Sequence, residues 1–243
     1  MGHVDSQQVS PPRKWLLLGG SIFVWGLSFL SAAYSETYIA GQVGYTMAQD
    51  TTHGKANDPT YAGLPSGTSI SDVRLSNSLM YGMKLGHYFN SMPWLGVELE
   101  SFVTIPHRPQ QRLTLGVPGI GTIQQDEGGA TNRLVVVSPN LMMRYQAGAF
   151  EPYVGVGPGL FFLRQQQLTS VVGGLNYAQS STGVGLNTQV GLRYRLTSHI
   201  ALFGEWKFNY ARIDLSGQAD VGHFGINAIT TLHHFAFGVG YHF

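Results

Sequence analysis

The chain has 243 residues, no cysteine, a formal net charge of +1, 32 glycines, 12% aromatic residues and only 11% charged residues. The lack of cysteine excludes a disulfide framework and thiolate chemistry, and the near-zero charge excludes the basic excess that a nucleic-acid partner needs. The mean hydropathy of +0.01 excludes a bundle of transmembrane helices. Few charges combined with many glycines and aromatics are instead typical of a transmembrane β-barrel, in which only alternate residues are apolar.

Residues 1–35 have the organisation of a secretory signal peptide. The positive pair Arg13-Lys14 precedes an apolar run, and small residues at the −3 and −1 positions precede Glu36. A cleavage site after Ala33 fits the rule of small residues nearly as well. The alternative is an uncleaved anchor helix, but the apolar run is short for a membrane span of about 20 residues. The sequence therefore predicts a signal peptide followed by a single domain over 36–243.

The rest of the chain contains eight segments in which apolar residues alternate with small or polar ones. A period of two is that of a β-strand with two different faces. Each segment is long enough for a tilted membrane-spanning strand of about 9–11 residues. The pattern predicts strands at about 37–47, 76–89, 94–105, 132–146, 151–164, 182–196, 199–212 and 229–243.

The connections between these segments alternate between short and long. Three are tight turns, and the other four are long and rich in Gly, Ser, Thr, Asp and Gln: about 48–75, 106–131, 165–181 and 213–228. Short periplasmic turns and long external loops are the pattern of outer-membrane barrels. The expected fold is an all-β, eight-stranded, antiparallel up-and-down transmembrane barrel, a size that side chains can fill.

The last segment has an apolar or aromatic residue at every second position to its end. These residues are Phe235, Phe237, Val239, Tyr241 and Phe243. An open sheet edge cannot lie in lipid, because each unpaired backbone group costs several kcal/mol. We therefore expect this strand to pair with the first one, over 36–47, and to close the sheet. The alternative is an edge strand of a soluble sandwich.

Most charged residues of the strands lie on the face opposite the apolar one. This predicted lumen charge network consists of Lys84, Glu98, Glu100, Arg144, Arg193, Arg195, Glu205 and Lys207. We expect Lys84 to face Glu98 and Glu100 across a short turn, and Arg193 and Arg195 to stand close to Glu205. Glycines alternate with these residues, so the prediction is a narrow lumen plugged by paired charges.

The inward carboxylates, the histidines and the glycine clusters also allow catalytic, metal-binding or phosphate-binding interpretations. Glu98 and Glu100 could serve as general acid and base, but ion pairing with Lys84, Arg193 or Arg195 accounts for them more simply. The nine histidines show no His-x-x-x-His spacing, and the glycine clusters lie inside strands rather than before helices. The sequence thus predicts no catalytic, cofactor or metal site.

The stretch 36–243 resembles the small outer-membrane β-barrel family that includes the transmembrane domain of outer membrane protein A and the opacity-type surface proteins. The segments that carry the resemblance are Tyr38–Tyr45, Tyr81–Phe89, Gly96–Glu100, Tyr153–Gly159, Gly183–Tyr194 and Phe237–Phe243. These patterns are specific for architecture and weak for function. In that family the aromatic terminal strand is a signature that the barrel assembly machinery reads.

The resemblance implies a monomer in the outer membrane of a Gram-negative bacterium, with a non-enzymatic structural or cell-surface role exerted through four external loops. Its expected partners are outer-membrane lipid and lipopolysaccharide, the assembly machinery and periplasmic chaperones during biogenesis, and a host or surface ligand at the loops. Two alternatives remain open: a narrow porin-like pore, and an enzyme that modifies lipid A. For an enzyme of the deacylase type, the resemblance implies a His-x-Ser pair on a strand. This chain has no such pair at His199 or at His233.

Overall fold

The computed structural model describes residues 36–48, 54–56, 67–71, 74–167, 178–219 and 222–243. The predicted signal peptide, 1–35, lies outside the described residues. Residues Glu36–Phe243 form one compact unit. No helix in the described part of the chain is long and apolar enough to cross a membrane.

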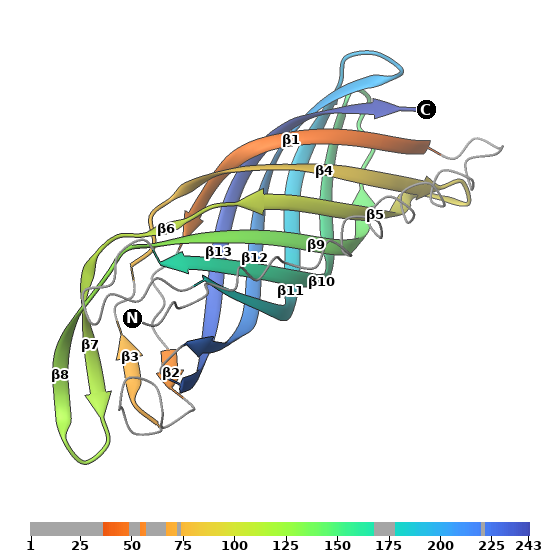
Figure 1. The fold of residues 1–243 in the computed structure, drawn as a ribbon. Helices are drawn as coiled ribbons and strands as arrows, with labels where there is room; N and C mark the ends of the chain where they lie inside the picture. The colour runs from red at the N-terminus through yellow and green to blue at the C-terminus, as the bar shows by residue number, and fades with distance from the viewer. Residues whose placement is uncertain (1–35, 49–53, 57–66, 72–73, 168–177, 220–221) are drawn as a thin grey trace, which may run out of the picture. The chain divides into compact units, whose positions relative to one another are not determined.

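Eight long strands close into an antiparallel barrel, as the sequence predicts (Figure 1). They follow one another around the barrel in sequence order, and β1 pairs with β13 to close it. The eight strands are β1 (Glu36–Ala48), β4 (Ser78–Phe89), β5 (Met92–Thr104), β9 (Ala130–Arg144), β10 (Phe150–Gln167), β11 (Ala178–Arg195), β12 (Ile200–Ala219) and β13 (Gly222–His242).

The register of the strands sets the width of the barrel. Cross-strand partners followed once around from Thr37 pass through His87, Val97, Leu141, Val156, Thr188, Phe208 and His233 and return to Met47. The return point is ten residues further along β1 than the start (47 − 37). This shear tilts the strands by roughly 35–45° and leaves a lumen that side chains can fill.

The two ends of the barrel differ. The short turns 89–92, 144–150 and 195–200 lie at one end, near the C-terminus, and we call this the turn end. The other end, which we call the loop end, carries the long connections. At the loop end, β7 and β8 project from the barrel as a hairpin (Figure 1).

The long connections contain strands that the sequence did not predict. Five short strands lie within 48–75 and 106–131: β2 (Gly54–Ala56), β3 (Ser69–Ser71), β6 (His107–Arg108), β7 (Gln111–Val117) and β8 (Gly121–Glu127). Four of them continue the sheet from β13 in the order β2, β3, β7, β8, while β6 pairs with β9. The loop end therefore carries a small sheet of its own.

The predicted loop 213–228 is wrong for most of its length, and the predicted loop 165–181 is wrong at both ends. Strand β10 continues into the latter segment as far as Gln167 and β11 begins in it at Ala178, while 168–177 lies outside the described residues; β12 and β13 extend through nearly all of 213–228. Apolar alternation ends where a strand no longer faces lipid, but backbone pairing needs no apolar side chains. Polar residues such as Gln165 and Gln166 therefore extend the ladder without a signal in the hydrophobic pattern.

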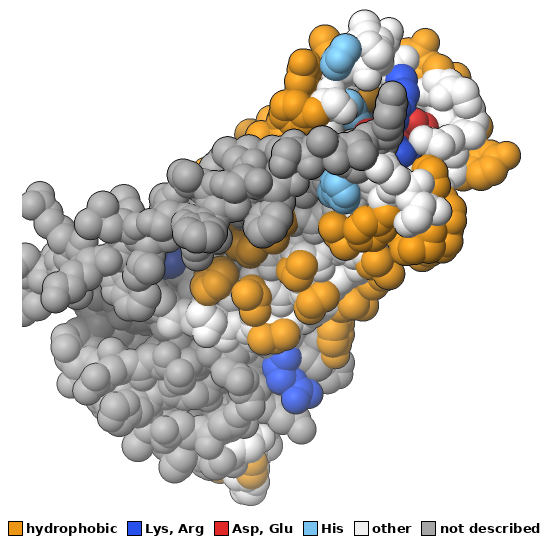
Figure 2. Space-filling view, turned by 90° about the vertical axis from the view of Figure 1, so that its right-hand side faces the viewer, with side chains coloured by type: hydrophobic (Ala, Val, Ile, Leu, Met, Phe, Trp, Pro, Cys, Tyr) orange, Lys and Arg blue, Asp and Glu red, His pale blue; other side chains and the backbone are white. Residues whose placement is uncertain are grey.

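The outer wall of the barrel is apolar. Large hydrophobic side chains at alternate positions of all eight long strands are exposed, among them Val43, Leu79, Val184 and Phe237. Figure 2 shows such side chains covering much of the barrel wall on the face in view. Soluble proteins rarely expose so extensive an apolar surface, whereas the wall of a barrel in a bilayer requires it.

Candidate functional site: the barrel lumen

Aromatic rings fill much of the lumen, and each lies directly across from a glycine on a neighbouring strand. The pairs are Tyr38 with Gly86, Tyr88 with Gly96, Phe102 with Gly82, Tyr153 with Gly191, Phe161 with Gly183, and Phe203 with Gly238. All six rings are buried. The sequence had predicted a small and polar inner face, so these apolar rings are a difference from the prediction.

At four of these glycines, Gly86, Gly96, Gly191 and Gly238, a ring occupies space that a side chain would take. A Cβ atom at Gly86 would lie 2.2 Å from the ring of Tyr38, and one at Gly238 would lie 2.3 Å from the ring of Phe203. Real Cβ atoms do not approach other atoms so closely. These inner glycines therefore leave the space that the rings need in order to extend across the lumen.

A central charge cluster lies among these rings. The Nζ atom of Lys84 is 2.7 Å from a carboxylate oxygen of Glu205 and 3.4 Å from one of Glu98. Two tyrosines donate hydrogen bonds to the same carboxylates: Tyr38 to Glu98 (2.5 Å) and Tyr153 to Glu205 (2.8 Å). Lys84 also donates to the side-chain oxygen of Gln189 at 3.0 Å. All the charges of this cluster are buried and partnered, as low-dielectric surroundings require.

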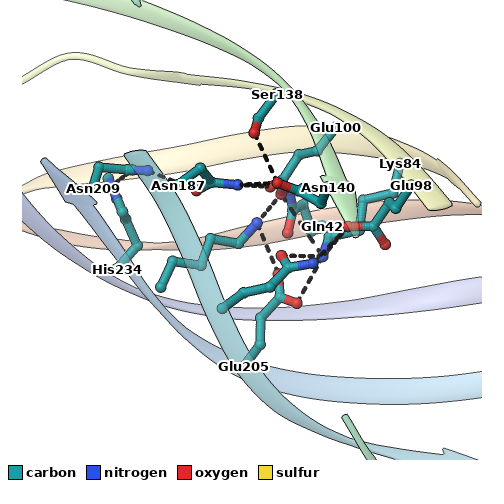
Figure 3. Close-up of polar contacts among 12 residues, drawn as sticks. Gln42, Lys84, Glu98, Glu100, Ser138, Asn140, Asn187, Glu205, Asn209 and His234 are labelled. Atoms are coloured by element: carbon teal, nitrogen blue, oxygen red, sulfur yellow. Dashed lines mark hydrogen bonds and ion pairs between the residues drawn. The ribbon is translucent and has the colours of Figure 1, made fainter. Parts of the chain in front are cut away.

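Glu100 joins this cluster to a ladder of amides that crosses the lumen (Figure 3). Its carboxylate contacts the ammonium of Lys207 and accepts hydrogen bonds from Gln42 at 2.6 Å and Asn187 at 3.2 Å. Lys207 also pairs with Glu205 at 2.9 Å. Glu100 and Lys207 are both fully buried, so they form an ion pair without access to solvent.

The amide ladder continues from Asn187 towards β1. Asn209 donates to Asn187 at 2.6 Å, and Nε2 of His234 lies 2.8 Å from the side-chain oxygen of Asn209. The other ring nitrogen of His234 lies 2.8 Å from the hydroxyl of Thr46. An Nε2–H tautomer, which donates to Asn209 and accepts from Thr46, satisfies both contacts. The ladder thus connects opposite parts of the wall through polar contacts alone.

A second charge cluster closes the turn end. Arg144 lies 2.6 Å from Glu36 and 3.4 Å from Glu151. Arg193 lies 3.4 Å from Glu151, and Arg195 contacts both carboxylates. The expected proximity of Arg193 and Arg195 to Glu205 is therefore wrong, because these arginines reach to the turn end while Glu205 pairs with the two lysines.

Two carboxylates of this cluster, Glu36 and Glu151, are missing from the predicted network. Their position in the alternation could have revealed them. Glu36 lies two residues before the inward Tyr38, and Glu151 lies two residues before the inward Tyr153. Both stand at the first positions of predicted strands, at the edge of the alternating pattern. With them, the two charge clusters together contain five basic and five acidic side chains: Lys84, Arg144, Arg193, Arg195 and Lys207 against Glu36, Glu98, Glu100, Glu151 and Glu205.

Guanidinium groups also lie against the tyrosine rings. Arg144 is 3.7 Å from the centre of the Tyr88 ring, and Arg193 is 4.6 Å from that of Tyr38. A cavity of about 10 Å³, bordered by Tyr38, Lys84 and Phe203, lies between the two clusters. That volume corresponds to about one water molecule. Rings and ion pairs therefore occlude the lumen over its turn-end half.

The predicted C-terminal signature lies on the outer wall. Its five residues, Phe235, Phe237, Val239, Tyr241 and Phe243, are all exposed. Their strand pairs with both β12 and β1, and the backbone N–H of Phe243 donates to the carbonyl of Thr37 at 2.9 Å. The signature thus forms part of the seam at which the barrel closes.

The described residues contain no group of three or more His, Cys, Asp or Glu side chains placed to hold a metal ion. The adjacent His233 and His234 lie on opposite faces of β13. His233 stacks on Trp206 on the outer wall, while His234 lies against Phe102 in the lumen. Glu98 and Glu100 both face the lumen, where each contacts a lysine.

A closed barrel with an apolar outer wall and a charged, filled lumen defines a transmembrane β-barrel of the bacterial outer-membrane class. The chain belongs to the family described as the outer membrane protein beta-barrel domain, whose model matches residues 22–243. The family is one of Gram-negative outer membranes. No curated protein sequence matches the chain.

Solved structures share the architecture at low sequence identity. The outer membrane protein OprG from Pseudomonas aeruginosa is 15% identical, with 86% of this chain and 96% of that chain covered and a TM-score of 0.54. Neisserial surface protein A is 14% identical over 85% and 97% of the two chains, with a TM-score of 0.49. The outer membrane protease OmpT from Escherichia coli is 10% identical over 86% and 96%, with a TM-score of 0.45. The likeness to OprG supports the fold and leaves function open.

Proposed function

We propose that this protein is a non-enzymatic outer-membrane barrel that acts at the cell surface through its loop end. The observation that carries the proposal is the combination of an occluded lumen with a structured loop end. The ion pairs and rings described above fill the turn-end half of the barrel around a cavity of about 10 Å³. Glu98, Glu100 and Glu205 are buried and paired with lysines, which favours a structural role of the lumen over a pore or an enzyme.

The β7–β8 hairpin is the strongest candidate for a contact surface at the loop end. The ion pair between Arg112 and Asp126, at 2.8 Å, connects its two strands on an exposed face. Its tip turns at Gly119 and Gly121, both with positive φ, and presents an exposed Ile120. Binding residues are often found on loops that a rigid scaffold positions, and here the scaffold is the barrel.

Deletion and complementation test the proposal. A strain without the protein should be complemented either with the full chain or with a variant in which a short Gly-Ser turn replaces 111–127. We expect both to restore detergent resistance, because the barrel is the same, and only the full chain to restore attachment of cells to host-surface matrix. Full attachment by the hairpin-deleted strain, or an unchanged phenotype of the deletion strain in both assays, would contradict the proposal.

A further inference from the structure

Two arginines lie side by side on the outer wall of the barrel. Arg133 of β9 and Arg164 of β10 are direct cross-strand partners, and both are exposed. Apart from them, Arg212 of β12 is the one outward charge among the described side chains of the eight long strands. Neither Arg133 nor Arg164 pairs with a carboxylate among the described residues. Like charges directly opposite each other destabilise a sheet. An anion bound between the two guanidinium groups would therefore offset their repulsion.

A groove of about 340 Å³ lies at this arginine pair. The groove is lined by Arg133, Arg164 and Ser180, which are cross-strand neighbours at one level of the sheet, and by Val135, Phe162 and Thr182, which are cross-strand neighbours two residues nearer the turn end. Cations and a hydroxyl donor therefore lie next to a largely apolar surface. This is the arrangement that an amphiphile with an anionic head group needs.

The height of the arginine pair matches the border of the membrane. Outward residues of β10 are apolar from Phe150 to Phe162, and the next outward residue is Arg164. That stretch of about 12 residues, at about 3.3 Å per residue and a tilt of about 40°, is roughly 30 Å tall, the thickness of the hydrocarbon core of a bilayer. Arg164 thus lies where the head groups of the leaflet at the loop end begin.

We propose that this groove binds a phosphorylated glycolipid of the outer leaflet, with a phosphate between Arg133 and Arg164 and an acyl chain over Val135 and Phe162. Guanidinium groups bind phosphate through paired hydrogen bonds, and one phosphate offers enough oxygens for both arginines. Ser180, the cross-strand partner of Arg164, supplies a further donor to the head group. The proposal rests on the loop end facing outward, as in the proposed function, but not on any role of the β7–β8 hairpin.

Native mass spectrometry of the folded barrel released from detergent, titrated with bis-phosphorylated lipid A, measures this binding. We expect the double variant Arg133→Gln/Arg164→Gln to bind on the order of 10-fold more weakly than wild type, since two charge-assisted contacts are lost. Each single variant should show an intermediate loss. Wild type should bind dephosphorylated lipid A as weakly as the double variant binds the phosphorylated form, and millimolar inorganic phosphate should not displace the lipid.

Arg212→Gln is the matched control, because Arg212 is an outward arginine at the same border with Val184, not an arginine, as its cross-strand partner. It should retain close to wild-type affinity. Heat-dependent gel migration identifies the folded fraction of every variant, so that a folding defect is not scored as a loss of binding. Wild-type affinity in the folded double variant, or an equal loss in Arg212→Gln, would overturn the assignment. Displacement by inorganic phosphate alone would reduce the site to a simple anion site and would also overturn it.

Discussion

Gly86 lies directly across the β1–β4 ladder from Tyr38, whose ring occupies the place that a side chain at position 86 would take. The hydroxyl of the same tyrosine donates to Glu98 in the central charge cluster. One glycine therefore positions a ring, and that ring positions a buried carboxylate. A ring takes the place of a glycine's side chain in the same way at Gly96, Gly191 and Gly238, so the plug of the lumen depends on glycines as well as on charges.

Substitution of Gly86 should show this dependence. We expect Gly86→Ala to lower the free energy of unfolding by about 1–3 kcal/mol, the usual cost of overpacking, as measured by urea unfolding in lipid vesicles. In a Tyr38→Ala background the same substitution should cost little, because the ring is absent. Gly41→Ala is the control, since a Cβ there meets nothing within 4 Å. An equal loss in both backgrounds would show that the ring is not the cause.

Glu100 tests the buried ion pairs. Glu100→Ala should lower the free energy of unfolding by about 3–5 kcal/mol, the range for breaking a buried pair, because it removes a partner of Lys207. Adding Lys207→Met should restore more stability than adding Lys84→Met, since Glu100 contacts Lys207 directly and lies 3.8 Å from Lys84. If both double variants are no more stable than Glu100→Ala alone, the cost of an orphaned charge is not what the substitution measures.

Single cysteines can establish the orientation of the barrel, because the chain has none of its own. Ile120→Cys, at the exposed tip of the β7–β8 hairpin, should react in intact cells with a maleimide that cannot cross membranes. Ser91→Cys, in the turn between β4 and β5, should react only after lysis. Labelling of position 91 but not of position 120 in intact cells would show that the loop end faces the periplasm.

The predicted signal peptide is tested by the N-terminus of the protein in the membrane. We expect the chain isolated from outer-membrane fractions to have, by mass spectrometry, the mass of a polypeptide that begins at Glu36, or at Tyr34 if cleavage occurs after Ala33. Recovery of the full-length chain in an inner-membrane fraction would instead support the uncleaved anchor helix.

The sequence predicted the eight strands of the barrel and the side on which its charges lie, because both follow from a period of two. It missed the rings inside the barrel: Phe102 and Phe203 are apolar residues on the polar face, and only the glycines opposite them make room. It also missed which charges pair. Arg193 and Arg195 lie on the strand next to Glu205, but pairing across a narrow lumen depends on shear and side-chain length, which local spacing does not contain.

The polar extensions of β10 to β13 escaped prediction for a related reason. Hydrophobic alternation reports contact with lipid, and it ends at residues such as Phe162, where the apolar wall ends. The same alternation places Arg133 and Arg164 on the outer face, but their adjacency comes from the β9–β10 register, which the sequence alone did not provide.

Conductance of the purified, folded protein in planar bilayers tests the occluded lumen most directly. The rings across the turn-end half and the two neutralising charge clusters predict little or no steady current, at neutral pH and at moderate voltage. A variant that removes the rings of Tyr38, Tyr153 and Phe203 together should conduct more than wild type if it remains folded. Large, long-lived open channels from the wild-type protein would contradict the occluded lumen and favour the pore.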